Sequence, residues 1–288
     1  MTTHAASEKE HNPLAFQQGR QQSWRLADIP FDSIDIEAVR NDTYLFYLLA
    51  AASFVEITSD LYTNNLVDYF DGDEPLQNWL LHQWEREEMQ HGAALKRYVL
   101  TVWPEFDWEL AYAGFYAEYS RLCVEENLGP TRGLELVARC VVETGTATLY
   151  TLLQRLSPEP VLRDLTGKIR ADEVRHYKYF YHYFLEYRSQ ERPRRLAVLR
   201  SLWHRVGEID DEDSYIAFKY VYCTRHPERA DFETEYRVYR QRFLALARSY
   251  YPVDMAVKMF LKPLQLNPRL QKVTVPVLTA GTRYLILR

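Results

Sequence analysis

The residues with the clearest chemical potential form a motif that occurs twice in this sequence. Glu88-Met-Gln-His91 and Glu173-Val-Arg-His176 both have the form Glu-x-x-His, and a single glutamate on an earlier predicted helix precedes each motif. Because residues i and i+3 lie on one face of a helix, the glutamate and histidine of each motif can reach one metal ion together. Four carboxylates and two imidazoles in this order can bind two metal ions inside a four-helix bundle. The predicted metal ligands are Glu56, Glu88, His91, Glu143, Glu173 and His176.

The positions of two turns indicate that these ligands lie at the same depth. Gly72, in Asp-Gly-Asp-Glu-Pro, lies midway between the first single glutamate and the first motif, and Pro158, in Ser-Pro-Glu-Pro, lies midway between the second pair. Both segments are typical of turns. Each arm has about 15 residues and would span roughly 23 Å as a helix. Two helical hairpins would therefore bring the ligands to one level of a bundle.

The charge of this ligand set agrees with two divalent metal ions. Four carboxylates carry about four negative charges, and burying them without a metal would be very costly. Carboxylate and imidazole ligands suit iron or manganese. We therefore expect two iron ions per chain, with manganese as the alternative.

Composition and periodicity favour an all-α fold. Apolar residues make up 47% of the 288 residues, and only ten residues are glycine. We expect an irregular N-terminal arm over 1–34 and one helical domain over 35–288, with a core bundle over about 35–190 and accessory helices and a tail over 191–288. The expected helices are 35–70, 74–102, a crossover helix over 105–127, 131–156, 160–190, 194–208, 213–225 and 229–262.

Prolines mark the expected end of the helical region. Pro252 is expected to kink or break the helix over 229–262. Pro263, Pro268 and Pro276 lie close together in the last part of the chain. They predict an extended tail that packs over the bundle.

Cysteine usage and hydropathy favour a reducing compartment. Cys123, Cys140 and Cys223 show no paired spacing, so the sequence predicts no disulfide framework. No N-terminal apolar segment resembles a signal peptide, and no run approaches the length of a membrane span. We therefore expect a soluble cytoplasmic protein without a transmembrane segment.

The net charge of −5 is spread unevenly along the chain. Residues 236–288 contain ten Lys or Arg and one acid, Asp254, so they carry about +9 and leave −14 for residues 1–235. Three interpretations remain open: a solvated basic surface, a docking face for an acidic partner such as a carrier protein or a ferredoxin-like electron donor, or contact with an anionic membrane surface. We expect a homodimer and no nucleic-acid partner.

An acidic residue also precedes each Glu-x-x-His motif. These residues are Glu87 and Asp172. A metal-bound histidine usually donates its other ring N–H to a carboxylate, which fixes its tautomer and orientation. We therefore predict that Asp172 pairs with His91 and Glu87 with His176, the alternative being that both acids are ordinary exposed residues.

The two motifs resemble those of soluble acyl-carrier-protein desaturases, which have the ferritin-like di-iron fold. Glu87-Glu88-Met-Gln-His91-Gly92 is similar to their first motif, and Ala171-Asp172-Glu173-Val-Arg175-His176 is similar to their second. The resemblance covers about residues 40–190. It implies a ferritin-like four-helix bundle with a crossover helix and additional C-terminal helices, ligand roles for the six residues named above, and bridging roles for Glu88 and Glu173.

Glu143-x-x-Thr146 also resembles this family. There a threonine one turn after the glutamate faces the oxygen-binding side of the metal centre, so the resemblance implies a proton-delivering, catalytic role for Thr146. The alternative is a helix threonine that bonds back to its own backbone. One departure is Tyr177, which follows the second histidine where the family commonly has an acid.

The expected function is that of a di-iron oxidoreductase that activates dioxygen and desaturates or hydroxylates a hydrophobic substrate, such as an acyl group on a carrier protein. An N-oxygenase or hydroxylase acting on a small aromatic or amine metabolite is the main alternative. His182, the nearest spare ligand for such an enzyme, is on the wrong face of an ideal helix. Iron storage is a further alternative. A radical-storing role is disfavoured because Leu95 occupies the position where that class has a tyrosine.

Overall fold

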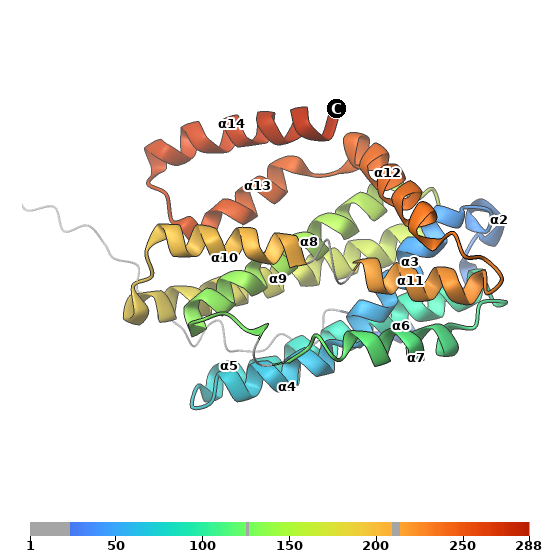
Figure 1. Ribbon diagram of the computed structural model, residues 1–288, viewed down its shortest axis with the longest axis horizontal. Coiled ribbons are helices and arrows are strands. Elements are labelled where there is room, and N and C mark those ends of the chain that lie inside the picture. Colours follow the sequence, from blue (N-terminus) through green and yellow to red (C-terminus); the bar gives the residue numbers. More distant parts are fainter. Residues whose placement is uncertain (1–23, 125–126, 209–213, 288) are drawn as a thin grey trace, which may run out of the picture.

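Helices are the only regular elements in residues 24–124, 127–208 and 214–287, which the computed structural model describes (Figure 1). The all-α prediction is therefore confirmed. Four helices form the first part of the chain: α2 (Ile36–Val39), α3 (Thr43–Ile57), α4 (Ser59–Tyr69) and α5 (Glu74–Trp79). The π-helical turn η3 (Leu80–Trp84) then leads into α6 (Glu85–Val102), followed by α7 (Trp108–Tyr119), α8 (Arg132–Leu156) and α9 (Pro160–Glu191). The C-terminal part contains α10 (Arg195–Glu208), α11 (Ser214–Arg225), α12 (Phe232–Tyr250), α13 (Val253–Leu261), η6 (Lys262–Leu264) and α14 (Pro268–Leu287).

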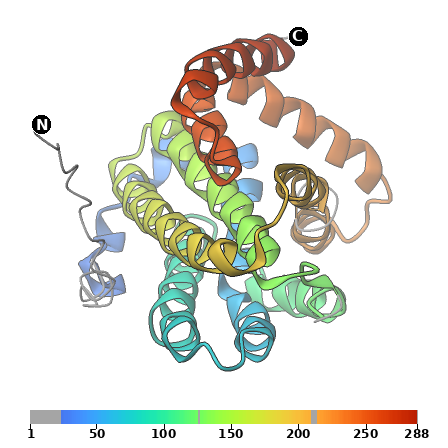
Figure 2. The same cartoon turned by 90° about the vertical axis from the view of Figure 1, so that its left-hand side faces the viewer.

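Two antiparallel helix pairs form the centre of the molecule. α3 packs against α6, and α8 packs along α9. In Figure 2 the second pair (green and yellow) runs diagonally across the picture, above the cyan and blue helices of the first hairpin. The predicted turns lie where the pairs reverse: Gly72 has a φ of +85° between α4 and α5, and three residues, Ser157 to Glu159, join α8 to α9.

The single helix predicted over 35–70 is wrong, because the structure divides it into α2, α3 and α4. Asp42 begins α3 by accepting hydrogen bonds from the backbone N–H groups of Tyr44 and Leu45. Thr58 interrupts the helix with φ −95° and ψ 9°, and its hydroxyl donates to the Phe54 carbonyl. A hydroxyl that bonds to the preceding turn often bends a helix.

Gly92, directly after His91, allows α6 to approach this break closely. A Cβ atom at residue 92 would lie 2.5 Å from the backbone nitrogen of Ile57. Only glycine therefore fits at this contact between the backbones that carry Glu56 and His91.

The second hairpin helix contains an irregularity that the sequence did not reveal. Pro75 lies in the first turn of α5, as predicted, and Asp73 caps that helix. The π-helical turn η3 then ends one residue before α6, four residues ahead of Glu88. Such π segments occur frequently at functional sites, where an extra residue re-aims the side chains that follow.

The crossover helix predicted over 105–127 is shorter than expected. α7 begins after Asp107, whose side chain accepts from the Leu110 backbone N–H, and it ends at Tyr119. It packs against α11 and α3. The prediction also covered residues 125–126, which lie outside the described residues.

The C-terminal tail is helical, so the predicted extended segment is wrong. Pro268 occupies the first turn of α14, where a missing N–H costs nothing, and Pro276 lies inside this helix. α14 lies over α13 at the edge of the molecule (Figure 1) and also contacts α12. Pro252 separates α12 from α13, as the sequence predicted.

The last part of the predicted N-terminal arm, residues 24–34, packs on the helical domain. Residues 1–23 lie outside the described residues. From Trp24 onward the chain packs on the helices through buried apolar side chains, which include Trp24, Ile29, Phe31 and Ile34. Two short 3₁₀ turns, η1 (Leu26–Asp28) and η2 (Phe31–Ser33), carry this segment.

One stretch of the described chain, Thr43–Tyr69, is long and apolar enough to cross a membrane, with a mean hydropathy of 1.3. Within the protein, 72% of its most apolar window is buried. A buried core helix gives the same signal, so this stretch is weak evidence for a membrane span.

Candidate metal centre

The six predicted ligands meet in the interior, between the two helix pairs. α3 contributes Glu56, α6 contributes Glu88 and His91, α8 contributes Glu143, and α9 contributes the remaining two. None of the six is more than 6% exposed. They form two groups, and the candidate ligand atoms in each group lie within 4.8 Å of one another. The first group is Glu56, Glu88, His91 and Glu173, and the second is Glu88, Glu143, Glu173 and His176.

Both groups contain Glu88 and Glu173. Both residues therefore lie between the two groups, and their role in bridging two metal ions stays a prediction. Each group supplies three carboxylates and one imidazole, which is a suitable ligand set for a metal ion.

Apolar layers enclose this polar level from both sides. On α9, for example, Ile169 belongs to one apolar cluster and Phe180 to the other, with both α9 ligands between them. On α8, Tyr150 belongs to the first of these clusters and Cys140 to the second, with Glu143 between them. The ligand level is therefore the polar layer of an otherwise apolar interior, where charges interact strongly.

The predicted pairing between histidines and the preceding acids is present. His91 Nε2 lies 3.1 Å from Asp172 Oδ2, and His176 Nε2 lies 2.7 Å from Glu87 Oε2. Both acids are buried, so the alternative of exposed acids is wrong. A proton held on each Nε2 leaves Nδ1 as the atom able to bind a metal.

The Nδ1 atoms point toward the ligand carboxylates. His91 Nδ1 lies 3.0 Å from Glu173 Oε1, and His176 Nδ1 lies 2.8 Å from Glu88 Oε1 and 3.6 Å from Glu143 Oε2. These five atoms are buried, and although each imidazole nitrogen lies within ion-pair distance of a carboxylate oxygen, none of the five makes a hydrogen bond of good geometry to any described residue. Buried polar atoms are rarely left in this state. A cluster of five such atoms with metal-ligand chemistry therefore fits bound metal.

The pKa values of the imidazoles reflect this acidic surrounding. Burial alone would lower the pKa of His91, but contacts with Asp172, Glu173 and other acids raise it well above its usual value. The pKa of His176 is raised in the same way, against burial, by Glu143, Glu87 and Glu88. The surrounding acids therefore favour the protonated form of both imidazoles in the metal-free protein.

The pKa of the Glu143 carboxyl group is also raised, but here burial is the main cause. Burial raises the pKa of its carboxyl group well above the usual value, and the negative charges of Glu173 and Glu88 raise it further, against the contact with His176. The metal-free cluster thus retains protons that a metal ion would displace.

Arg175 links the two outer acids, a role that the sequence analysis missed. Its Nη2 lies 2.8 Å from Glu87 Oε2 and 2.7 Å from Asp172 Oδ1. Although burial opposes ionisation, these contacts and those to the histidines hold the pKa values of Glu87 and Asp172 below their usual values. The position of Arg175 inside the second Glu-x-x-His motif was the sequence feature that could have indicated this role.

Three aromatic residues also reach the site, and only Trp24 among them was not expected there. The Trp84 indole N–H donates to Glu143 Oε1 at 3.1 Å, and the Tyr150 hydroxyl donates to Glu56. The Trp24 indole N–H donates to Asp172 Oδ2 at 2.8 Å, and its ring stacks on the His91 ring. No helical periodicity marks Trp24, so the sequence carried no signal for its role.

Thr146 lies beside the ligand groups and contacts both a ligand side chain and its own helix backbone, and its catalytic role stays a prediction. Its hydroxyl donates to Glu173 Oε2 at 2.6 Å and also lies 3.3 Å from the carbonyl oxygens of Val142 and Glu143. The contact with Glu173 is the shorter one, and it connects this hydroxyl to a shared ligand.

Other candidates do not join the ligand groups. His182 pairs with Glu186 at 3.0 Å and belongs to neither group. The Tyr177 hydroxyl donates to the Met259 carbonyl of α13. Cys140 is buried near Glu143, and burial followed by that charge raises the pKa of its thiol well above the usual value.

No protein-family model and no curated protein sequence matches this chain. The function is therefore inferred from the chemistry of the site.

Proposed function

We propose that this protein is a ferritin-like di-iron oxidoreductase that uses dioxygen to oxidise a hydrophobic substrate by desaturation or hydroxylation. The observation that supports this most is the pair of buried ligand groups that share Glu88 and Glu173, with the Thr146 hydroxyl on Glu173. A purely structural metal site needs neither two adjacent groups nor a hydroxyl at a shared ligand.

The protein would hold one metal ion with each ligand group. Glu56 and His91 would bind the first, Glu143 and His176 the second, and Glu88 and Glu173 both. When bound, the two reduced iron ions would supply electrons to dioxygen. Manganese fits the same ligands.

The surrounding residues would orient these ligands and manage protons. Asp172 and Glu87 hold the Nε2 protons, which keeps each Nδ1 directed inward, and Arg175 fixes both acids. Thr146 can hold a proton next to Glu173 and exchange it when the charge on that carboxylate changes. The apolar layers on either side would exclude water from the reaction.

The substrate class is supported by the apolar surroundings and by the charge of the C-terminal region. Trp84, Phe180 and Tyr150 are buried beside the ligands, which suits a hydrophobic chain. The net charge of +9 on residues 236–288 would suit an acidic partner, such as an acyl carrier protein or a ferredoxin that supplies electrons.

A radical-storing role is a second candidate, since the buried Tyr150 hydroxyl donates to Glu56, one of the ligands. Exposure of the iron-loaded protein to dioxygen would then give a tyrosyl electron paramagnetic resonance signal that Tyr150→Phe abolishes. The absence of such a signal in the wild-type protein would favour substrate oxidation.

The proposed function is tested by loading the protein with ferrous iron under anaerobic conditions and then adding dioxygen. We expect two irons per chain, and oxygen consumption that a long-chain acyl carrier conjugate stimulates. Fewer than one iron per chain would contradict the metal assignment. Uptake of many irons per chain would indicate storage, and stimulation by an aromatic amine alone would indicate an N-oxygenase.

A further inference from the structure

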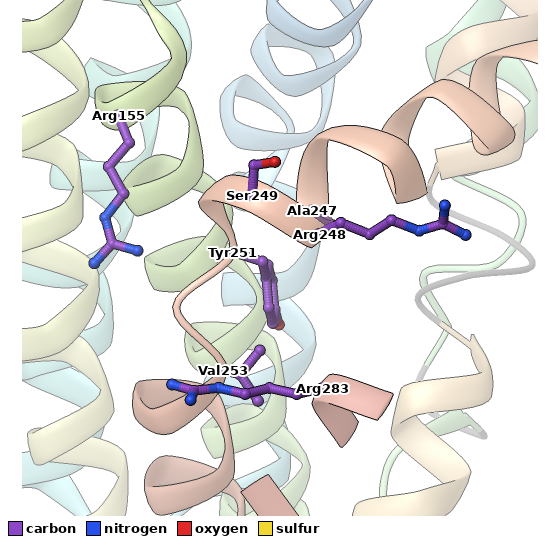
Figure 3. Close-up of a pocket in the computed structure, with 7 residues that line it drawn as sticks. All are labelled: Arg155, Ala247, Arg248, Ser249, Tyr251, Val253 and Arg283. Carbon is purple, nitrogen blue, oxygen red and sulfur yellow. The ribbon is translucent and has the colours of Figure 1, made fainter. Parts of the chain in front are cut away.

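A cavity of about 300 Å³ lies away from the metal ligands, where α8, α12, α13 and α14 meet (Figure 3). This volume is at the lower end of the range for small-molecule sites. Its lining contains three arginines and no acid: Arg155, Ala247, Arg248, Ser249, Tyr251, Val253 and Arg283. The helices that form it, α8 apart, lie outside the two central helix pairs.

Two of the three arginines extend to the same side of the cavity. In Figure 3, Arg155 and Arg283 extend toward the same side of the cavity, one above and one below Tyr251, whereas Arg248 extends to the opposite side. Arg155 uses Nη1 to donate to the Tyr250 carbonyl, and Arg283 uses Nη2 to pair with Asp254. Because a guanidinium group has five N–H donors, each retains donors for a carboxylate or phosphate.

The rest of the lining is mixed, with apolar Ala247 and Val253 beside Ser249 and Tyr251, and Tyr251 connects it to the helix that carries Glu143. The Tyr251 hydroxyl accepts a hydrogen bond from Thr148 Oγ1 at 3.1 Å. Thr148 lies about 8 Å beyond Glu143 along α8, and Arg155 lies about 18 Å beyond it. Ala247 and Val253 are buried apolar residues of the same lining. Because Thr148 lies between Arg155 and Glu143 on α8, a ligand with its head at Arg155 and its chain on Tyr251 would extend in the direction of the ligand level.

We propose that this cavity binds the anionic head, a carboxylate or a phosphate, of an amphipathic substrate whose apolar chain extends along α8 toward the metal centre. The assignment of the ligand as substrate rests on the proposed function. Binding of the head group depends on Arg155 and Arg283 and does not require metal.

Calorimetric titration with dodecanoate, dodecyl phosphate, dodecanol and inorganic phosphate tests this site. We expect dodecanoate or dodecyl phosphate to bind, and to bind more tightly than either dodecanol or inorganic phosphate. The better of the two acids identifies the head group. Arg155→Gln and Arg283→Gln should each weaken binding roughly tenfold, as expected for loss of a charge-assisted hydrogen bond. Arg248→Gln is the matched control and should leave binding unchanged.

Several results would overturn the proposal. Dodecanol binding as tightly as the acids would exclude an anionic head, and inorganic phosphate binding as tightly as dodecyl phosphate would indicate a site for a free anion. Equal losses in all three arginine variants would indicate only a general charge effect. All titrations are repeated on metal-free and metal-loaded protein, so that loss of metal binding with intact dodecanoate binding refutes the proposed function alone.

The direction of the chain is tested with dodecanoate that carries a ¹³C-labelled terminal methyl group. In manganese-loaded protein the methyl resonance should broaden more than the carboxyl resonance, because the chain end lies nearer to the paramagnetic ions. Stronger broadening at the carboxyl end would contradict the proposed orientation.

Discussion

Asp172→Asn tests how the outer acids control metal binding. Asp172 accepts hydrogen bonds from Trp24 and His91, at 2.8 and 3.1 Å, and pairs with Arg175 at 2.7 Å. Asparagine keeps the shape but loses the charge, and its amide N–H₂ would face another donor. Loss of an outer partner of a metal-bound histidine typically weakens binding 10- to 100-fold, or about 1.4–2.8 kcal/mol. We expect a value near the upper end, because three donors lose a charged acceptor.

The effect should be confined to one metal. His91 belongs only to the group with Glu56, so Asp172→Asn should lower the affinity for the metal ion in that group. The affinity for the second metal ion should stay close to the wild-type value. Glu87→Gln should do the reverse, because Glu87 pairs with His176. Anaerobic titration with ferrous iron against a chelator, at pH 8 to limit proton competition, measures both affinities.

Asp164→Asn is the matched control for this experiment. Asp164 lies on the same helix, α9, and forms an exposed pair with Lys168. This variant should bind both metals as the wild-type protein does. Two unchanged affinities in Asp172→Asn would refute the reasoning, as would weakening of the same metal by Asp172→Asn and Glu87→Gln.

Three further predictions concern the ligands and their protons. Glu88→Ala should abolish the two-metal centre, because both groups lose a shared carboxylate; elemental analysis that still finds two metals per chain would exclude its bridging role. Thr146→Val should leave the metal content unchanged but slow the oxygen-dependent step by about 10²-fold, because a proton-transferring group is lost. Stopped-flow absorbance measures this rate. An unchanged rate would assign the hydroxyl a structural role at Glu173. Because the pKa values of His91, His176 and Glu143 are raised in the metal-free protein, metal binding at pH 7 should release about two protons from the imidazoles and a further one from Glu143, and metal affinity should increase with pH. Calorimetry in buffers of different ionisation enthalpy measures this release, and affinity independent of pH would contradict it.

The sequence predicted the ligand cluster because its signals are local. Residues three apart on a helix share a face, and turns at Gly72 and Pro158 set the depth of both hairpins, so Glu88 and Glu173 could be placed together before the structure was known. The pairing of Asp172 with His91 followed from the chemistry of metal-bound imidazole.

The features that the sequence did not predict depend on contacts between distant segments. The break at Thr58 lies where α6 approaches through Gly92, a contact that periodicity does not encode. Trp24 contacts Asp172 across 148 residues of sequence. The helical C-terminus was misread because proline disfavours helix interiors, whereas Pro268 lies in the first turn of α14, where it is compatible with a helix.

The central claim is that two metal ions occupy the ligand cluster, and anomalous X-ray diffraction at the iron absorption edge tests it most directly. In crystals of iron-loaded wild-type protein we predict two anomalous peaks per chain, about 3.5–4 Å apart, with Glu88 and Glu173 between them. A single peak, or no peak within this cluster, would contradict the account.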